Sequence, residues 1–131
     1  MILLDTHALI WWVNGGEELS PRARRTIHSS LADGPVGASA ISVFEISTAV
    51  RRGRLDLGMA AERWLADASL LPDLKFHDVT PEIARLAGSF DASMPGDPGD
   101  RLIAATALSL GVALVTADDR LRRYPHLKTV W

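Results

Sequence analysis

Short apolar runs alternate with amphipathic stretches along the whole chain. The first run, residues 1–5, ends in an aspartate, and residues 6–13 then follow helical spacing up to Asn14 and two glycines. Four later runs have the same strand-like character: residues 36–39, 74–79, 112–116 and 128–131. Buried parallel strands typically read as continuous apolar stretches, so these runs predict a parallel sheet.

Helices are predicted between the strands by capping residues as well as by spacing. Ser20-Pro21, Thr80-Pro81 and Asp97-Pro98 each place a capping side chain before a proline, which suits the first helical position. The predicted helices span residues 6–13, 21–33, 41–52, 59–71, 81–90, 98–110 and 117–124. This alternation predicts an α/β three-layer sandwich with a central, mostly parallel sheet of four to five strands flanked by helices, in a single domain of residues 1–131.

Composition narrows the function classes only modestly. Hydrophobic residues make up 47% of the chain and charged residues 23%, and the net charge of −2 gives no basic signature of nucleic-acid binding. The absence of cysteine excludes disulfides and thiolate metal sites. No apolar run reaches the roughly 18 residues needed to span a bilayer, and the N-terminus lacks a signal-peptide pattern. We therefore expect a cytoplasmic protein without membrane contact.

The most informative polar feature is a set of acidic residues at strand ends and helix starts. Its members are Asp5, Glu45, Asp97, Asp100 and Asp118. Carboxyl ends of parallel strands meet at one edge of a sheet, where sites form. Gathered carboxylates repel one another unless a hard divalent cation lies among them. The pattern therefore predicts metal-assisted chemistry on phosphate.

Structural roles compete with catalytic ones at several of these positions. Ser42 and Glu45 fit a capping box, in which Glu45 only caps its helix. Asp97 is expected to be a helix cap, and Asp118 suits an N-cap. Asp100 lies in a first helical turn, where the helix dipole favours a carboxylate. Asp5 is the hardest to explain structurally, because it lies between an apolar strand and an apolar helix and needs a partner if it is buried.

The chain resembles the PIN-domain toxins of the VapC type. The residues that carry this resemblance are LLDTHALIWW near the N-terminus, SVFEIS with RRGRLDL in the middle, and DPGDRLIAATA with LVTADDRL in the last third. The order of these motifs matches along nearly the whole chain. Such toxins are the nuclease halves of bacterial type II toxin–antitoxin pairs.

The resemblance implies a Mg²⁺- or Mn²⁺-dependent endoribonuclease, inhibited by a cognate antitoxin and forming a homodimer. RNA is the implied substrate, and DNA is approached only through the antitoxin. Matched motif by motif, the catalytic acids are Asp5, Glu45, Asp100 and Asp118. We expect Asp5 and Asp100 to be the principal metal ligands, with Glu45 and Asp118 acting through water or on a second ion. Supporting positions are Thr6, Ser42, Asp97 and Thr116.

One motif departs from the family pattern. Many relatives have a large aromatic residue at the third position of the DPxDR motif, where this chain has Gly99. The preceding segment also lacks the histidine found in many relatives. We expect this difference to make the loop before Asp100 more mobile without changing the acidic set.

Basic and aromatic residues add weaker signals. The arginine clusters at residues 22–25, 51–54 and 120–123 are interpreted as solvated helix faces, some of which can contact phosphates. Arg101 is the best single candidate for substrate binding, although a structural ion pair is an equal alternative. Because adjacent residues of a helix point about 100° apart, Trp11 and Trp12 are not both expected in the core, and one is predicted to form an apolar groove or dimer face.

Two other functions compete with the nuclease. A PIN-like RNA-binding or scaffold module with weak catalysis is disfavoured by the intact acidic set. A phosphoryl-transfer enzyme using Asp5 as covalent acceptor is disfavoured because its usual second acid, two residues on, is replaced here by His7. The pattern leaves open the RNA target and whether DNA is also cut.

Overall fold

The computed structural model describes all 131 residues, Met1–Trp131, and contains five strands and seven α-helices. In chain order the elements are β1 (Ile2–Leu4), α1 (Thr6–Val13), α2 (Pro21–Ser30), the 3-10 turn η1 (Leu31–Asp33), β2 (Val36–Ser39), α3 (Ala40–Arg51), α4 (Ala61–Ser69), β3 (Leu74–His77), α5 (Pro81–Ser89), α6 (Pro98–Leu110), β4 (Ala113–Val115), α7 (Asp119–Arg122) and β5 (Thr129–Val130). The predicted strands and helices are all present, and α2 is shorter than expected because its last turn tightens into η1.

The five strands form one sheet in the order β3-β2-β1-β4-β5, and every neighbouring pair is parallel. The strand β1 lies at its centre, with Leu4 beside Ala38 of β2 and beside Val115 of β4. The predicted α/β sandwich is confirmed, and its sheet is wholly rather than mostly parallel.

Alternate residues of the central strands serve two separate cores. Ile2 and Leu4 belong to a cluster with residues of α1, α2 and α4, whereas Leu3 packs with Leu114 and with Ile103 of α6. The helix α5 packs on α6 and forms the outermost layer on that side. Successive side chains of a strand point to opposite faces, so a three-residue strand is enough to join both helical layers.

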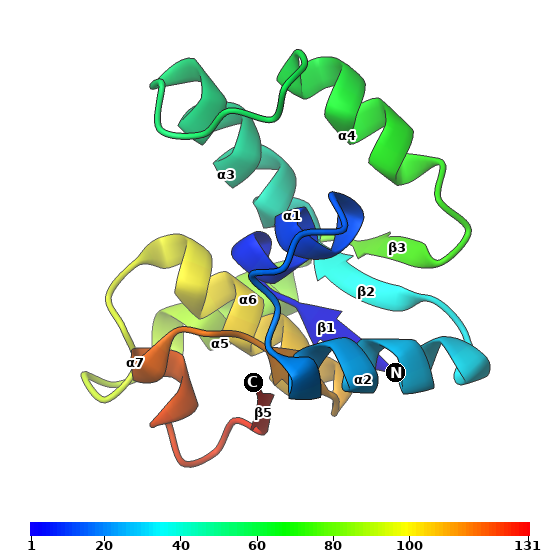
Figure 1. Cartoon of the computed structure of the whole chain (residues 1–131). Coiled ribbons are helices and arrows are strands. Elements are labelled where there is room, and N and C mark those ends of the chain that lie inside the picture. The colour runs from blue at the N-terminus through cyan, green and yellow to red at the C-terminus, as the bar shows by residue number, and fades with distance from the viewer.

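The side of the sheet on which new strands are added changes at β1. The elements from β1 to β3 extend the sheet to one side, and β4 and β5 then extend it to the other. Open α/β sheets bind ligands at such a switch point, outside the carboxyl ends of the strands. Figure 1 shows α3 and α4 reaching out beyond this edge of the sheet.

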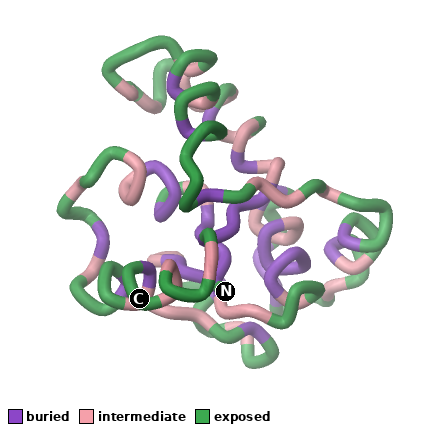
Figure 2. Tube along the Cα trace, turned by 90° about the vertical axis from the view of Figure 1, so that its right-hand side faces the viewer, coloured by how far each residue is buried: buried purple, intermediate pink, exposed green.

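The interior is concentrated around the strands. Leu3, Leu4, Val36, Leu114 and Val115 are fully buried, and Figure 2 shows buried residues in the middle of the trace with exposed connections around them. Trp64 of α4 is also buried, and its indole N–H donates to Asn14 Oδ1 at 2.8 Å. None of the helices combines the length and apolar character that crossing a bilayer requires.

Candidate active site

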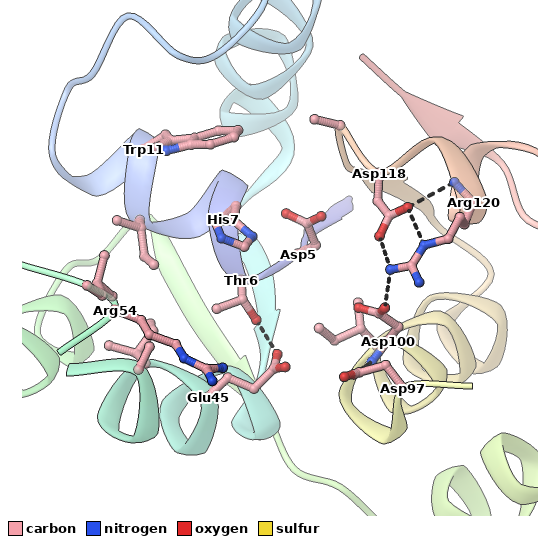
Figure 3. A pocket seen from close by; sticks show the side chains of 16 residues that line it. Asp5, Thr6, His7, Trp11, Glu45, Arg54, Asp97, Asp100, Asp118 and Arg120 are labelled. Atoms are coloured by element: carbon pink, nitrogen blue, oxygen red, sulfur yellow. Dashed lines mark hydrogen bonds and ion pairs between the residues drawn. The ribbon is translucent and has the colours of Figure 1, made fainter. Parts of the chain in front are cut away.

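The predicted acidic residues converge on one cavity at the carboxyl edge of the sheet. It has a volume of about 640 Å³, and Figure 3 shows the acidic side chains around it. The acidic lining residues are Asp5, Glu45, Asp97, Asp100 and Asp118. Residues separated by more than a hundred positions thus meet because β1 and β4 are neighbours in the sheet.

Asp5 lies at the bottom of this group, directly after β1. The residue is 9% exposed, and its Oδ1 accepts a hydrogen bond from the Ala8 amide at 2.8 Å, so Asp5 is also the N-cap of α1. Burial raises the pKa of Asp5, while Thr116 and the Ala8 amide oppose the rise. The expectation of a buried aspartate that needs a partner is confirmed. Its capping role was not predicted.

Glu45 reaches the cavity from the second turn of α3. The Thr6 hydroxyl donates to Glu45 Oε1 at 2.6 Å, and Ser42 Oγ lies 2.8 Å from Thr6 Oγ1. Because the single Thr6 proton points to Glu45, the buried Ser42 hydroxyl must donate to Thr6. Burial is the main cause of a raised pKa at Glu45.

The capping-box interpretation of Ser42 and Glu45 is wrong. The helix α3 begins at Ala40, and its N-cap is Ser39, whose hydroxyl accepts from the Ile41 amide at 3.1 Å. The chain is already helical at Ser42, so Ser42 and Glu45 are one turn apart on one face and both face Thr6. The helix predicted over residues 41–52 agrees with α3 to within one residue, and only its capping residue was assigned one turn too late.

Asp97 and Asp100 come from the start of α6. Asp97 is the N-cap, as expected, and its Oδ1 accepts from the Asp100 amide at 3.0 Å. Burial raises the pKa of Asp100 to about 6, with further contributions from the carboxylates of Asp97, Asp118 and Glu45. The carboxylates therefore do repel one another, as the sequence predicted.

Asp118 is the N-cap of the short helix α7, and a cation from that helix lies against it. Its Oδ1 accepts from the Arg120 amide at 2.9 Å, and Arg120 Nη2 lies 3.1 Å from Asp118 Oδ2 and 3.5 Å from Asp100 Oδ2. Hydrogen bonding and charge from Arg120 hold the pKa of Asp118 below its usual range. Thr116 Oγ1 accepts from the Asp118 amide at 3.1 Å. Together with the contacts described above, this places all four predicted supporting residues at or beside the acidic group: Thr6, Ser42, Asp97 and Thr116.

Arg120 was missed as a residue of the site. Its sequence neighbourhood indicated only a solvated helix face, yet its guanidinium bridges two of the predicted acids at one side of the cavity (Figure 3). The sequence did contain one signal. A residue two positions after an N-cap aspartate lies in the first turn, within reach of that carboxylate.

Arg101 has a different role from the one expected. It does not line the cavity, and its guanidinium donates to the carbonyl oxygens of Ala87 at 3.0 Å, Pro95 at 3.3 Å and Phe90. These bonds use all three nitrogen atoms of the guanidinium and connect the loop before α6 to the end of α5. The prediction of a phosphate-binding Arg101 is therefore replaced by a structural role, and the loop expected to be mobile has a specific anchor.

The departure at Gly99 has a direct structural meaning. Gly99 is buried in the first turn of α6, and a Cβ built on it would lie 2.4 Å from Glu45 Oε2 and 2.7 Å from its Cδ. Any side chain at this position must displace the Glu45 carboxylate. The missing aromatic residue thus makes room for an acidic residue of the site, which the sequence did not reveal.

Aromatic residues form the wall of the cavity on the α1 side. Trp11 lies beside His7, with 5.6 Å between ring centroids, and beside Trp131 at 5.7 Å. Trp11 and Trp12 are both only partly buried, as predicted, and Trp11 and His7 line the cavity. The apolar surface predicted for one of this pair therefore adjoins the acidic group.

The chemistry of the donors suits a hard divalent cation. Every acidic ligand candidate offers carboxylate oxygen, which Mg²⁺ and Mn²⁺ prefer, and the raised pKa of Asp100 reflects burial first and the neighbouring carboxylates second. No group of three or more His, Asp or Glu side chains is close enough here to ligate one ion together. An ion bound to this arrangement would keep several water ligands, as Mg²⁺ commonly does.

Comparison with known proteins gives the same assignment. Residues 2–127 match the family model of the PIN domain. The chain is 39% identical over 132 residues to Ribonuclease VapC22 of Mycobacterium tuberculosis, covering 99% of this chain and 98% of that protein.

Solved structures of similar fold include toxin–antitoxin proteins. VapBC2 of Rickettsia felis, bound to a DNA fragment from its promoter, has a TM-score of 0.71 at 18% identity and covers 98% of this chain and 97% of that chain. VapC20 of M. tuberculosis, a sarcin–ricin loop cleaving toxin, has a TM-score of 0.67 at 18% identity, with 98% and 99% covered. At these identities the structures show the shared fold alone. The family model and the full-length relative show that this chain belongs to the PIN-domain family.

Proposed function

We propose that this protein is a metal-dependent endoribonuclease and the toxin of a type II toxin–antitoxin pair. The observation that carries this proposal is the convergence of Asp5, Glu45, Asp100 and Asp118 in one cavity of a PIN-domain chain. The full-length similarity to a protein named as a ribonuclease supports RNA as the substrate.

Asp5 and Asp100 are proposed as the principal ligands of Mg²⁺ or Mn²⁺, with Glu45 and Asp118 contributing through water or to a second ion. When bound, the cation would polarise the scissile phosphate and lower the pKa of an attacking water. Asp5 is held for this role by its buried position and by the Ala8 amide, which leaves one carboxylate oxygen directed away from the cap. Thr6 and Ser42 orient Glu45, whose carboxylate is suited to accept a hydrogen bond from water.

The partners of this chain are proposed from the molecules that are present in the similar solved structures. Several solved structures of this fold are complexes of a toxin with its antitoxin, and three similar structures include DNA. We propose that a cognate antitoxin inhibits this chain, that DNA is reached only through that antitoxin, and that the chain forms a homodimer. Co-purification with the product of an adjacent small gene and sedimentation of the pure chain test these partners.

Cleavage of structured RNAs by the purified protein tests the enzymatic function. We expect cleavage with Mg²⁺ or Mn²⁺, none with chelator, and a loss of at least about 100-fold in Asp5→Asn, because one ligand and its charge are removed. The fold should persist, since asparagine also caps helices. Asp73→Asn, at an exposed carboxylate outside the cavity, is the matched control.

Two results would contradict the nuclease. Chelator-insensitive cleavage would remove the metal from the mechanism. Binding of RNA without any metal-dependent cleavage would favour a PIN-like binding or scaffold module instead.

A further inference from the structure

Arg120 holds an unusual position for a solvent-exposed arginine. Its guanidinium bridges Asp118, at 3.1 Å, and Asp100, at 3.5 Å, which are 18 residues apart in sequence and come from different helices. Figure 3 shows the Arg120 side chain between Asp118 and Asp100, at one side of the acidic group. A positive charge of the chain itself therefore lies between two of the residues proposed to serve a cation.

The ion pairs of Arg120 with Asp100 and Asp118 are exposed enough for another cation to replace the guanidinium. The Arg120 side chain is 59% exposed, against 22% for Asp100 and 27% for Asp118. Exposed ion pairs contribute little to stability because water competes for both partners. A divalent ion carries twice the charge and uses the same oxygens, so it can displace the guanidinium.

A second, smaller cavity lies next to the first and shares Arg120 with it. This cavity has a volume of about 310 Å³, and its lining includes Arg120, Arg123 and the loop of residues 92–96. Arg123 has no carboxylate within 4.0 Å, and no carboxylate lines this hollow. Two arginines in a hollow without acids suit a phosphate group.

We propose that Arg120 exchanges partners during the reaction. In the free protein it takes the place of a cation on Asp100 and Asp118. When the divalent ion binds, Arg120 turns to the neighbouring hollow, where with Arg123 it binds the RNA phosphate next to the cleaved one. This inference rests on the proposed function and adds a substrate-binding site to it.

Binding of Mn²⁺ alone, measured by calorimetry, tests the first half of the exchange. Arg120→Gln should bind Mn²⁺ roughly three- to ten-fold more tightly than the wild type, as expected from the loss of two weak exposed pairs. Arg122→Gln and Arg123→Gln remove the same charge from the same region without touching Asp100 or Asp118, so their affinities should stay near that of the wild type.

The outcomes separate this inference from the proposed function. Equal Mn²⁺ affinities in all three variants and the wild type would overturn the exchange while leaving the metal site intact. An equal gain in all three would show a general charge effect and would also overturn it. No Mn²⁺ binding by any of them would contradict the metal-dependent function itself.

The second half is tested by the salt dependence of RNA binding. A short phosphorothioate RNA resists hydrolysis and keeps its charges, so its affinity can be measured by fluorescence anisotropy with saturating Mn²⁺. The RNA affinity falls as salt rises, so the slope of log K against log salt is negative. Arg120→Gln and Arg123→Gln should each reduce the magnitude of this slope by about 0.7, the value for one single-strand phosphate contact. Arg122→Gln should keep the wild-type slope.

The same salt slopes measured with chelator distinguish the exchange from a permanent phosphate contact of Arg120, which would not depend on the metal. Without metal, Arg120 stays on its carboxylates, and Arg120→Gln should leave the slope unchanged. A slope that Arg120→Gln does not alter with Mn²⁺ present would overturn the phosphate role. A slope reduced equally in magnitude with Mn²⁺ and with chelator would overturn the exchange.

Discussion

The two halves of the acidic cavity are held together in different ways. On the side of α1 and α3, Glu45 receives a short hydrogen bond from Thr6, which is in turn bonded to the buried Ser42. On the side of α6 and α7, Asp100 and Asp118 are joined only through the exposed side chain of Arg120. Neutral hydroxyls organise the first half, and an ion pair organises the second.

This difference indicates which half can adjust when ligands bind. Hydrogen bonds among partly buried groups are insensitive to salt and costly to leave unmade. Exposed ion pairs weaken in salt and are readily replaced. The α1/α3 half is therefore the fixed frame of the site, and the α6/α7 half is the part that responds to metal and substrate.

Gly99 of α6 lies against Glu45 of α3, and among the variants that test this comparison Gly99→Ala should have the largest effect. The new Cβ would overlap the Glu45 carboxylate, so Glu45 must leave its place in the fixed frame. A displacement of about 1 Å can reduce activity by about 100-fold, and we expect a loss of that order in RNA cleavage with little change in thermal stability.

Gly88→Ala is the matched control for this prediction. It introduces the same methyl group into the exposed face of helix α5, away from both cavities, and nothing lies within 4 Å of the added Cβ. If Gly99→Ala cleaves RNA like Gly88→Ala, then Glu45 does not need its observed position, and the frame is less rigid than its hydrogen bonds indicate.

Arg101→Ala should destabilise the loop that precedes α6 in the α6/α7 half. It removes the donors that tie the carbonyl oxygens of Ala87, Phe90 and Pro95, leaving the loop before Asp97 without its anchor. We expect a loss of about 2 kcal/mol in the free energy of unfolding, measured with urea. Arg85→Ala removes an exposed arginine of α5 and should change stability much less. An equal loss in both variants would contradict the anchoring role.

Ser42→Ala tests the fixed half with a smaller change. Thr6 would lose the hydroxyl that donates to it, and the expected cost is about 1 kcal/mol in the free energy of unfolding. Ser47→Ala, on the exposed face of the same helix, provides the comparison. A Ser42→Ala protein as stable as Ser47→Ala would show that the hydroxyl chain does not stabilise this half.

The pH dependence of stability without metal tests the charge at Asp100 in the α6/α7 half. The pKa of Asp100 is raised to about 6, so the folded state binds this proton more tightly than the unfolded chain does. The contribution of Asp100 is fully present below the ordinary pKa of 3.8 and is lost as the pH rises through about 6. Unfolding in urea with chelator should therefore show the wild type losing stability between about pH 4 and 6, and Asp100→Asn losing less.

Asp118 should not contribute in this window. Its pKa is lowered, so its stabilising effect is lost only as the pH falls below its usual value. A wild type and an Asp100→Asn variant with the same pH dependence would show that Arg120 already relieves the repulsion at Asp100.

Much of this molecule could be predicted from local patterns. The strands, the helix starts at Ser20, Thr80 and Asp97, and the acidic residues of the cavity all follow from apolar spacing, capping residues and their position after strands. The failure at Ser42 and Glu45 has a local cause as well, because two serines three residues apart both fit the start of α3 and the apolar run does not decide between them. These features depend on neighbours within one or two turns of the chain.

The α/β fold and the acidic edge follow from the sequence, since periodicity and capping act over short distances. Three contacts become visible only in the folded chain: Arg120 reaches Asp100, Arg101 faces backbone carbonyls, and Gly99 makes room for Glu45. Each of these contacts joins different elements of the chain. They depend on how helices pack at the edge of the sheet, and a shift of one or two ångströms, which no local pattern specifies, would change every one of them.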